Sequence, residues 1–483
     1  MKKILCLGLL ILLAAAARAE LKLPKVFADH MVLQRELDIP IWGWAEPREA
    51  VTIEFQDKRY RTRADKEGKW TLKLAPSAAG GPYELTVSTK GTSLVFRDVL
   101  VGDVWLLGGQ SNMEWALKNT NHGEDSIKVA DFPQIRLFEV GRNMSLSPMD
   151  DVPEATWSLC SPEAVANFSA IGYYFGKNIH RDLDVPVGLL DINWGGTVSE
   201  AWTSPDALLT HADFSEKVKN NQTNGPKDFS NPDDRKPNSW PTSLYFGMLE
   251  PVIPFAIKGA LWYQGESNAG RAYQYREIFP LMIADWRKQW GQGDFPFLWV
   301  QLANYKQPKE KPEDSDWAEL REAQTMALAL PHTAQAVIID RGEAGDIHPR
   351  DKWTVGERLA LAAKKIAYGM DVVYSGPTYK SMTTEGDKIR ISFDHLGSGL
   401  VVKDKYGYVK GFSVAGNDKV FHWVKGYQDG NDIILSIGEI TNPVAVRYGW
   451  ADNPDDLNVY NKEGLPANPF RTDDWQGITF GKK

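Results

Sequence analysis

Two stretches of the chain alternate apolar and polar residues, and they flank a middle stretch that does not. Between residue 21 and about residue 98, short runs such as residues 51–55 place every second apolar side chain on one face, and turn residues separate the runs. The same alternation returns after Gly369, for example over residues 388–393. Since this period is typical of half-buried strands, the pattern predicts a β domain at each end of the chain.

The middle stretch has apolar runs of strand length that alternate with segments of helical period. Alternation of this kind predicts a parallel sheet with helices on both faces. Residues 210–239 are rich in Asn, Asp, Pro and Lys and lack an apolar period, so we expect a surface excursion there. The expected strands cover residues 104–108, 187–193, 260–264, 297–302 and 336–340, and the expected helices cover residues 168–182, 280–290, 317–330 and 352–368.

The first 19 residues have the features of a secretory signal. Lys2 and Lys3 precede an apolar run over residues 4–17, and the small-residue pattern that ends at Ala19 predicts cleavage there. The apolar run is too short for a membrane span, so we expect a secreted or periplasmic protein without a membrane span in the mature chain. The predicted domains are residues 20–98 (β), 99–370 (α/β) and 371–483 (β).

Charge and cysteine content narrow the classes of protein. Removal of residues 1–19 takes away Lys2, Lys3 and Arg18 and no acidic residue, which changes the formal net charge from −8 to −11. Such an acidic chain is a poor partner for nucleic acid. Cys160 is the single cysteine beyond the signal, so we expect no internal disulfide and a fold stabilised by its cores.

Four polar, glycine-containing segments each follow a predicted strand, at residues 108–113, 193–197, 262–268 and 340–349. In an open parallel sheet, ligands bind beyond the carboxyl ends of the strands. Ser111 stands at a strand-to-helix turn, where its hydroxyl is exposed and its N–H faces outward, as a nucleophile requires. The turn is not the G-x-S-x-G elbow of the α/β-hydrolases, because Met113 replaces the second glycine.

The other three segments supply the remaining groups that acyl transfer needs. The glycine pair that ends at Gly196 lets backbone N–H groups approach an oxyanion, and Gln264 or Asn268 offers a side-chain N–H. His348 can act as the general base for Ser111, with a nearby carboxylate to orient its ring. Alone, each segment has a structural explanation, such as a helix cap, a tight turn or a buried polar contact. Together, at one sheet edge, they predict a serine esterase.

The same segments resemble a known family. The phrases GGQSNMEW, NWGGTVSEAW, WYQGESNA and GDIHPRDK, with the late stretch YGWADNPDDLNVYNKEGLPANPFRT, resemble the sialate O-acetylesterase family of the SGNH hydrolase superfamily, and the likeness runs from Met31 to Arg471. It implies a three-layer α/β/α domain flanked by β-sandwich-like domains. It also implies Ser111 as nucleophile, His348 as base, and Gly196, the Ser111 N–H and Gln264 as oxyanion donors, with Asn268 as the alternative to Gln264.

The position of the expected catalytic acid departs from the pattern of the superfamily. The superfamily commonly places its aspartate three residues before the histidine, where this chain has Gly345, and the acid here is Asp346, two residues before. Glu343, Asp340 and Glu266 remain alternatives, as does a Ser–His dyad braced by a backbone carbonyl. No His, Cys and carboxylate cluster has metal-ligand spacing, so we expect neither a metal nor another cofactor.

The substrate class is less defined than the reaction. Trp194 and Trp262 offer flat faces for pyranose stacking. The carboxylate of a sialic acid would suit a bidentate arginine, and the candidates are Arg271, Arg341 and Arg350. We expect a small-molecule or glycan substrate, and an O-acetylated sialic acid is the preferred candidate. The alternatives are an acetylated xylan or pectin and, from another class, a carbohydrate-binding protein with an inactive hydrolase core.

Overall fold

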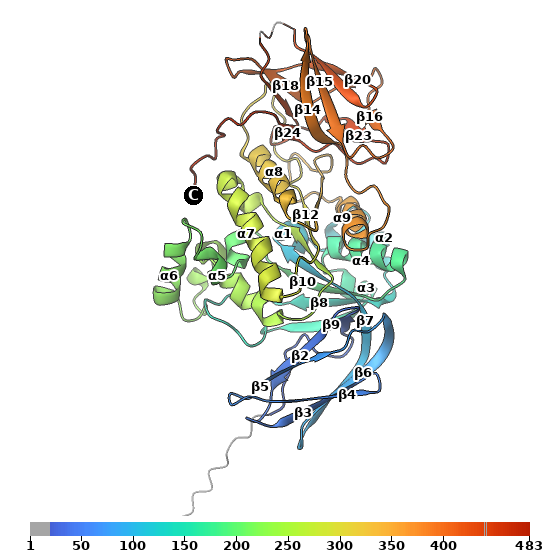
Figure 1. The fold of residues 1–483 in the computed structure, drawn as a ribbon, viewed down its shortest axis with the longest axis vertical. Coiled ribbons are helices and arrows are strands. Elements are labelled where there is room, and N and C mark those ends of the chain that lie inside the picture. The colour runs from blue at the N-terminus through green and yellow to red at the C-terminus, as the bar shows by residue number, and fades with distance from the viewer. Residues whose placement is uncertain (1–19, 439, 441) are drawn as a thin grey trace, which may run out of the picture.

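The computed structural model describes residues 20–438, 440 and 442–483 of the chain. The secretory signal predicted over residues 1–19 lies outside the described residues. A central α/β region carries one β domain at each end of the long axis of the molecule (Figure 1).

The central sheet has the strand order β13-β12-β11-β7-β10-β8-β9. Neighbouring strands are parallel except at the edge, where β9 is antiparallel to β8. Parallel strands end at a common edge, so the loops after β7, β10, β11 and β13 gather at one rim. The strands are β7 (Ser93–Gly109), β8 (Phe132–Val140), β9 (Ala155–Cys160), β10 (Val187–Asn193), β11 (Gly259–Tyr263), β12 (Phe297–Val300) and β13 (Thr333–Ala336).

Helices cover both faces of this sheet, which confirms the predicted architecture (Figure 1). Helix α4 packs against α9 on one face, and α7 packs against α8 on the other. In α9 an apolar stripe at helical spacing faces the core: Val355, Leu359 and Ala362 are fully buried, and Ile366 at the end of the helix is half-buried. The helices are α1 (Ser111–Glu114), α2 (Gly123–Lys128), α3 (Pro162–Val165), α4 (Ala170–Leu183), α5 (Pro205–Leu208), α6 (Ser215–Asn224), α7 (Ala272–Trp290), α8 (Asp316–Met326) and α9 (Lys352–Ile366).

The N-terminal β domain shares a strand with the central sheet. The first part of β7 pairs with β6, and its second part pairs with β10 and β11. The boundary that the sequence places between residues 98 and 99 therefore falls inside one continuous strand. The other strands are β1 (Val32–Gln34), β2 (Ile39–Trp44), β3 (Ala50–Phe55), β4 (Lys58–Arg63), β5 (Lys69–Leu74) and β6 (Gly80–Ser88).

The C-terminal β domain consists mainly of a five-stranded and a four-stranded sheet around its own apolar core. Arg321 of α8 connects it to the central region, because its guanidinium donates to the carbonyls of Leu302 and Ala303 on one side and of Ala451 and Asp452 on the other. The strands are β14 (Thr378–Glu385), β15 (Lys388–Asp394), β16 (Leu400–Val402), β17 (Tyr408–Val409), β18 (Phe412–Ala415), β19 (Phe421–Trp423), β20 (Lys425–Asp429), β21 (Asp432–Ser436), β22 (Ala445–Tyr448), β23 (Val459–Asn461) and β24 (Phe470–Arg471).

Several elements differ from their predicted bounds. Helix α7 begins at Ala272 and runs through Pro280, because buried side chains on both sides of the proline outweigh its cost of about 3 kcal/mol. The polar excursion contains α6, whose Val218 packs into a small cluster with Ile278 of α7. Strand β13 begins at Thr333 and ends at Ala336, so it precedes most of the predicted strand. Strands β8 and β9 were not predicted.

Candidate active site

Ser111 is the first residue of α1, two residues beyond the end of β7. Gly109 has a φ of +139°, and a Cβ there would lie 2.2 Å from the carbonyl oxygen of Tyr263, so the sharp turn requires glycine. The N–H groups at the start of a helix have no partner within the helix, which leaves that of Ser111 facing the rim. The glycines of this segment thus bring a hydroxyl and an N–H to the carboxyl edge of the sheet.

His348 meets Ser111 at this rim. Its Nε2 lies 2.8 Å from Ser111 Oγ, although 237 positions separate the two residues in the chain. The Trp115 ring stacks on the imidazole with a centroid separation of 4.7 Å and an interplanar angle of 14°. A neutral imidazole at this distance can accept the hydroxyl proton as the serine attacks an acyl carbon.

Asp346 is the carboxylate that contacts His348. Its Oδ1 accepts the backbone N–H of His348 at 2.9 Å and lies 3.3 Å from Nδ1. The three alternative acids have other partners. Asp340 forms an ion pair with Arg358, Glu343 accepts the backbone N–H of Arg350, and Glu266 accepts from Asn112.

Burial lowers the pKa of His348 below its usual value of 6.5. The nearby Asp346 carboxylate opposes this shift, and the Lys352 ammonium reinforces it. The imidazole is therefore held in the neutral form that a general base requires at neutral pH.

Gly196 is positioned as the sequence predicts, on the loop after β10. It is exposed, its φ is +75°, and a Cβ added there would have no atom within 4 Å. Its carbonyl accepts from the Asn238 amide at 2.8 Å. The preceding N–H, that of Gly195, is already donated to Glu114 Oε2 at 2.9 Å. Of the two glycines, Gly196 is thus the one with an N–H available to a ligand.

Gln264 and Asn268 lie beneath this loop, and both are buried. Gln264 Nε2 donates to the carbonyl of Thr197 at 3.1 Å and to Asn268 Oδ1 at 2.6 Å, while Asn268 Oδ1 also accepts the N–H of Ser199 at 3.1 Å. Because both amide hydrogens of Gln264 are used within the protein, this side chain holds the loop that carries Gly196.

A buried polar network beside Ser111 was not predicted from the sequence. The Asn112 amide donates to Glu266 Oε1 at 2.6 Å and to the carbonyl of Ile347 at 3.0 Å, and its Oδ1 accepts from the Lys352 ammonium. Burial raises the pKa of Glu266 and lowers that of Lys352 to about 7. Asn112 therefore joins the nucleophile turn to the residue before His348. The signal available in the sequence was that Asn112, Glu266 and Lys352 each stand within a motif phrase.

The aromatic and basic candidates for substrate binding differ in position. Trp262 is fully buried between Trp202 and Trp286, so it belongs to the core, whereas Trp194 is half-buried at the rim. The three arginines have acidic partners, namely Glu200 for Arg271 at 2.7 Å, Asp340 and Asp351 for Arg341 at 3.2 and 3.3 Å, and Glu343 for Arg350 at 3.5 Å.

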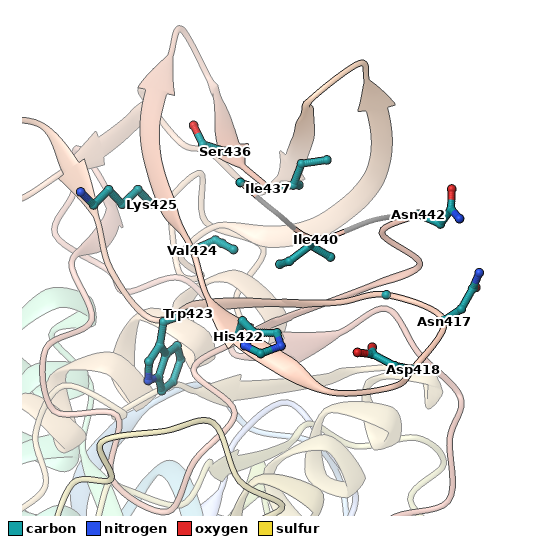
Figure 2. Close-up of a pocket in the computed structure, with 12 residues that line it drawn as sticks. Asn417, Asp418, His422, Trp423, Val424, Lys425, Ser436, Ile437, Ile440 and Asn442 are labelled. Atoms are coloured by element: carbon teal, nitrogen blue, oxygen red, sulfur yellow. The ribbon is translucent and has the colours of Figure 1, made fainter.

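Other features of the described residues do not add chemistry to this rim. A cavity of ≈710 Å³ lies in the C-terminal domain, where His422, Trp423 and Lys425 line it (Figure 2). None of the candidate site residues lines that cavity. Within residues 20–438, 440 and 442–483, no group of three or more His, Cys, Asp or Glu side chains is arranged to hold a metal ion. Over the same ranges, no helix combines the length and the apolar character needed to cross a bilayer.

Comparison with known proteins identifies the family of this chain. The model of the carbohydrate esterase, sialic acid-specific acetylesterase family matches residues 101–364, which contain all four motif segments. The chain belongs to this family. It is 30% identical to the sialate O-acetylesterase of Mus musculus over 92% of each chain, and 28% identical to that of Homo sapiens over 92% of this chain and 90% of the human one.

A solved structure agrees with this assignment. The crystal structure of a carbohydrate acetylesterase from Xanthomonas citri is 43% identical and has a TM-score of 0.86, with 94% of this chain and 100% of that chain covered. As a member of the sialic acid-specific acetylesterase family, the protein is an esterase, and the predicted family and enzyme class are confirmed.

Proposed function

We propose that this esterase removes O-acetyl groups from sialic acid by a two-step acyl transfer in which Ser111 is the nucleophile. The observation that carries the proposal is the 2.8 Å contact between Ser111 Oγ and His348 Nε2 at the carboxyl edge of the sheet. The names of the curated relatives support sialic acid as the substrate.

In the first step, His348 Nε2 takes the Ser111 proton while Oγ attacks the acetyl carbonyl carbon. The negative charge that develops on the carbonyl oxygen is stabilised by the backbone N–H groups of Ser111 and Gly196. Collapse of the tetrahedral intermediate releases the sugar hydroxyl, which receives the proton from His348. Water then attacks the acetyl-enzyme with His348 again as base, and acetate leaves.

Asp346 is the proposed acid of the catalytic set. Its carboxylate faces Nδ1 of His348 and favours the tautomer with the proton on Nδ1, which leaves Nε2 free to accept the proton of Ser111. Gln264 and Asn268 become positioning residues, because their hydrogen bonds to Thr197 and Ser199 fix the loop that follows Gly196. This differs from the sequence-based expectation that Gln264 itself donates to the oxyanion.

The Asp346→Asn variant is expected to lower kcat only about fivefold, the equivalent of about 1 kcal/mol. The carboxylate is 42% exposed and 3.3 Å from Nδ1, so water screens most of its charge, and an asparagine oxygen can still accept the N–H of His348. Steady-state hydrolysis of p-nitrophenyl acetate measures the effect, with Glu343→Gln as the control. A loss of about 10³-fold or more would show that Asp346 is indispensable, as in a strict triad.

The pH profile offers a test of the site's electrostatics. Since the pKa of His348 lies below 6.5, the acid limb of kcat/KM is expected to have its midpoint below pH 6.5. The Lys352→Met variant removes one of the charges that lower this pKa, so its midpoint should move to higher pH. Lys365→Met, an exposed change on the same helix, should leave the midpoint in place. An unchanged midpoint in Lys352→Met would contradict the assignment of the acid limb to His348.

The substrate is tested by acetate release from O-acetylated sialic acid compared with acetylated xylan, with the Ser111→Ala variant as background. We expect the higher kcat/KM on the sialic acid. A preference for the xylan would replace the proposed substrate with a neutral glycan and keep the mechanism. Absence of release from both, and from p-nitrophenyl acetate, would favour a carbohydrate-binding protein with an inactive core.

A further inference from the structure

A cavity of ≈620 Å³ opens at the same rim as Ser111, and we call it the rim cavity. Its walls come from three places: the loop after β8, Trp194 after β10, and the polar excursion from Lys227 to Arg235. Strand β10 lies beside β7, which ends at the nucleophile turn, and β8 lies beside β10. The rim cavity is therefore next to the Ser111 turn along the carboxyl edge of the sheet.

Direct contacts join the wall of the rim cavity to the Ser111 turn. The N–H of Trp194 donates to the carbonyl of Gly109 at 3.1 Å, and a Cβ added to Gly195 would lie 3.1 Å from Ser111 Cβ. Arg142 donates to Glu114 of α1, and its guanidinium lies 5.6 Å from the centroid of the Trp194 ring. A sugar in this cavity would therefore lie beside Ser111.

The lining of the rim cavity is cationic, although the chain as a whole has a net charge of −8. Arg142, Lys227 and Arg235 line it together with one acid, Asp228. Asp228 accepts the N–H of Ser230 at 2.9 Å within its own turn. Among the described residues, Arg142 pairs with Glu114, whereas Lys227 and Arg235 have no acidic partner.

The remaining lining suits the body of a sugar. Trp194 and Phe229 supply ring faces, and Met144 and Met149 supply flexible apolar surface. The volume lies within the range of about 300–1,000 Å³ that is usual for small-molecule sites. Arg235 uses its Nε for the carbonyl of Phe229, which leaves its terminal N–H groups for a ligand.

We propose that the rim cavity holds an acidic sugar whose acetyl ester lies at Ser111, and that Arg235 and Lys227 bind the carboxylate of that sugar. This inference rests on the proposed function, because it places the acetyl group at Ser111. Arg142 is not assigned to the carboxylate. Its pair with Glu114 supports the hydrogen bond that the Gly195 N–H donates to Glu114, so it positions the loop after β10. Arg271, Arg341 and Arg350 are then not the carboxylate partners.

The test compares an O-acetylated sialic acid with its methyl ester, which keeps the acetyl group and loses the negative charge. The double variant Lys227→Gln with Arg235→Gln should raise KM for the acid about tenfold, the loss expected for exposed charge-assisted contacts. It should leave KM for the methyl ester and the rate on p-nitrophenyl acetate unchanged. The matched control is Lys217→Gln with Lys236→Gln, which removes two exposed lysines that do not line the rim cavity.

Ionic strength gives a second readout on the unmodified enzyme. Added salt should raise KM for the acid in the wild type and have a smaller effect in the double variant. If the double variant raised KM equally for the acid and its methyl ester, or raised it for neither, the inference would be overturned and the proposed function would remain intact. A wild type that hydrolyses p-nitrophenyl acetate and acetylated xylan but neither sialic acid substrate would overturn both the inference and the proposed substrate.

Discussion

Replacement of Ser111 by alanine is expected to reduce acetyl ester hydrolysis by about 10³- to 10⁶-fold, because it removes the oxygen that forms the acetyl-enzyme. The change removes one oxygen, whose contact is with His348. The melting temperature should therefore stay close to that of the wild type. Acetate release and thermal unfolding, measured on the same preparation, test both parts of this prediction.

The matched control is Ser267→Ala, a serine within the WYQGESNA segment whose backbone N–H donates to Gln110 at 3.4 Å. This variant should keep most of the activity. If Ser111→Ala remained active while folded, the nucleophile would have to be sought elsewhere, and Ser267 would be the first alternative.

Replacement of His348 by glutamine is expected to lower kcat by at least about 10³-fold, because glutamine can donate and accept hydrogen bonds but cannot take up the serine proton. The residual activity should lose the acid limb of the pH profile and rise with hydroxide concentration. Steady-state kinetics from about pH 5 to about pH 9, an interval that contains the usual histidine pKa, measure both effects.

His422→Gln is the control for this experiment. His422 lines the cavity of the C-terminal domain shown in Figure 2, where no candidate catalytic residue lies. Its replacement should leave kcat and the pH profile as in the wild type. An acid limb that persisted in His348→Gln would assign the titration to another group, with Lys352 and Glu266 as the nearest alternatives.

Much of the fold follows from local patterns in the sequence. The predicted strand over residues 187–193 coincides with β10 because a largely apolar run between two loops is typical of a buried parallel strand. The stripe of α9 likewise identifies its buried face. Pro280 and α6 were misjudged because tertiary packing, which sequence period does not encode, stabilises helix at both places.

The candidate site was predictable where topology determines it. Parallel strands bring their carboxyl ends to one edge, so strand assignment predicts that Ser111 and His348 share a rim. Their contact also requires the loop after β13 to reach back across β12 and β11 to the end of β7. Side-chain partners were not predictable in the same way. The hydrogen bonds of Gln264 and the burial of Trp262 depend on residues from several distant segments.

The buried polar network beside Ser111 was not predictable from the sequence either. Asn112, Glu266 and Lys352 come from three separate segments, and their interaction exists only once the sheet has assembled. A polar residue within a motif phrase indicates importance, but it does not indicate which partner it will meet.

The most direct test of the central claim is to locate the nucleophile by mass spectrometry after reaction with diethyl p-nitrophenyl phosphate, which phosphorylates an activated serine. The account predicts a single adduct on the peptide that contains Ser111, absent in Ser111→Ala and formed much more slowly in His348→Gln. An adduct on another residue, or an unchanged rate of labelling in His348→Gln, would contradict the claim that the imidazole activates this hydroxyl.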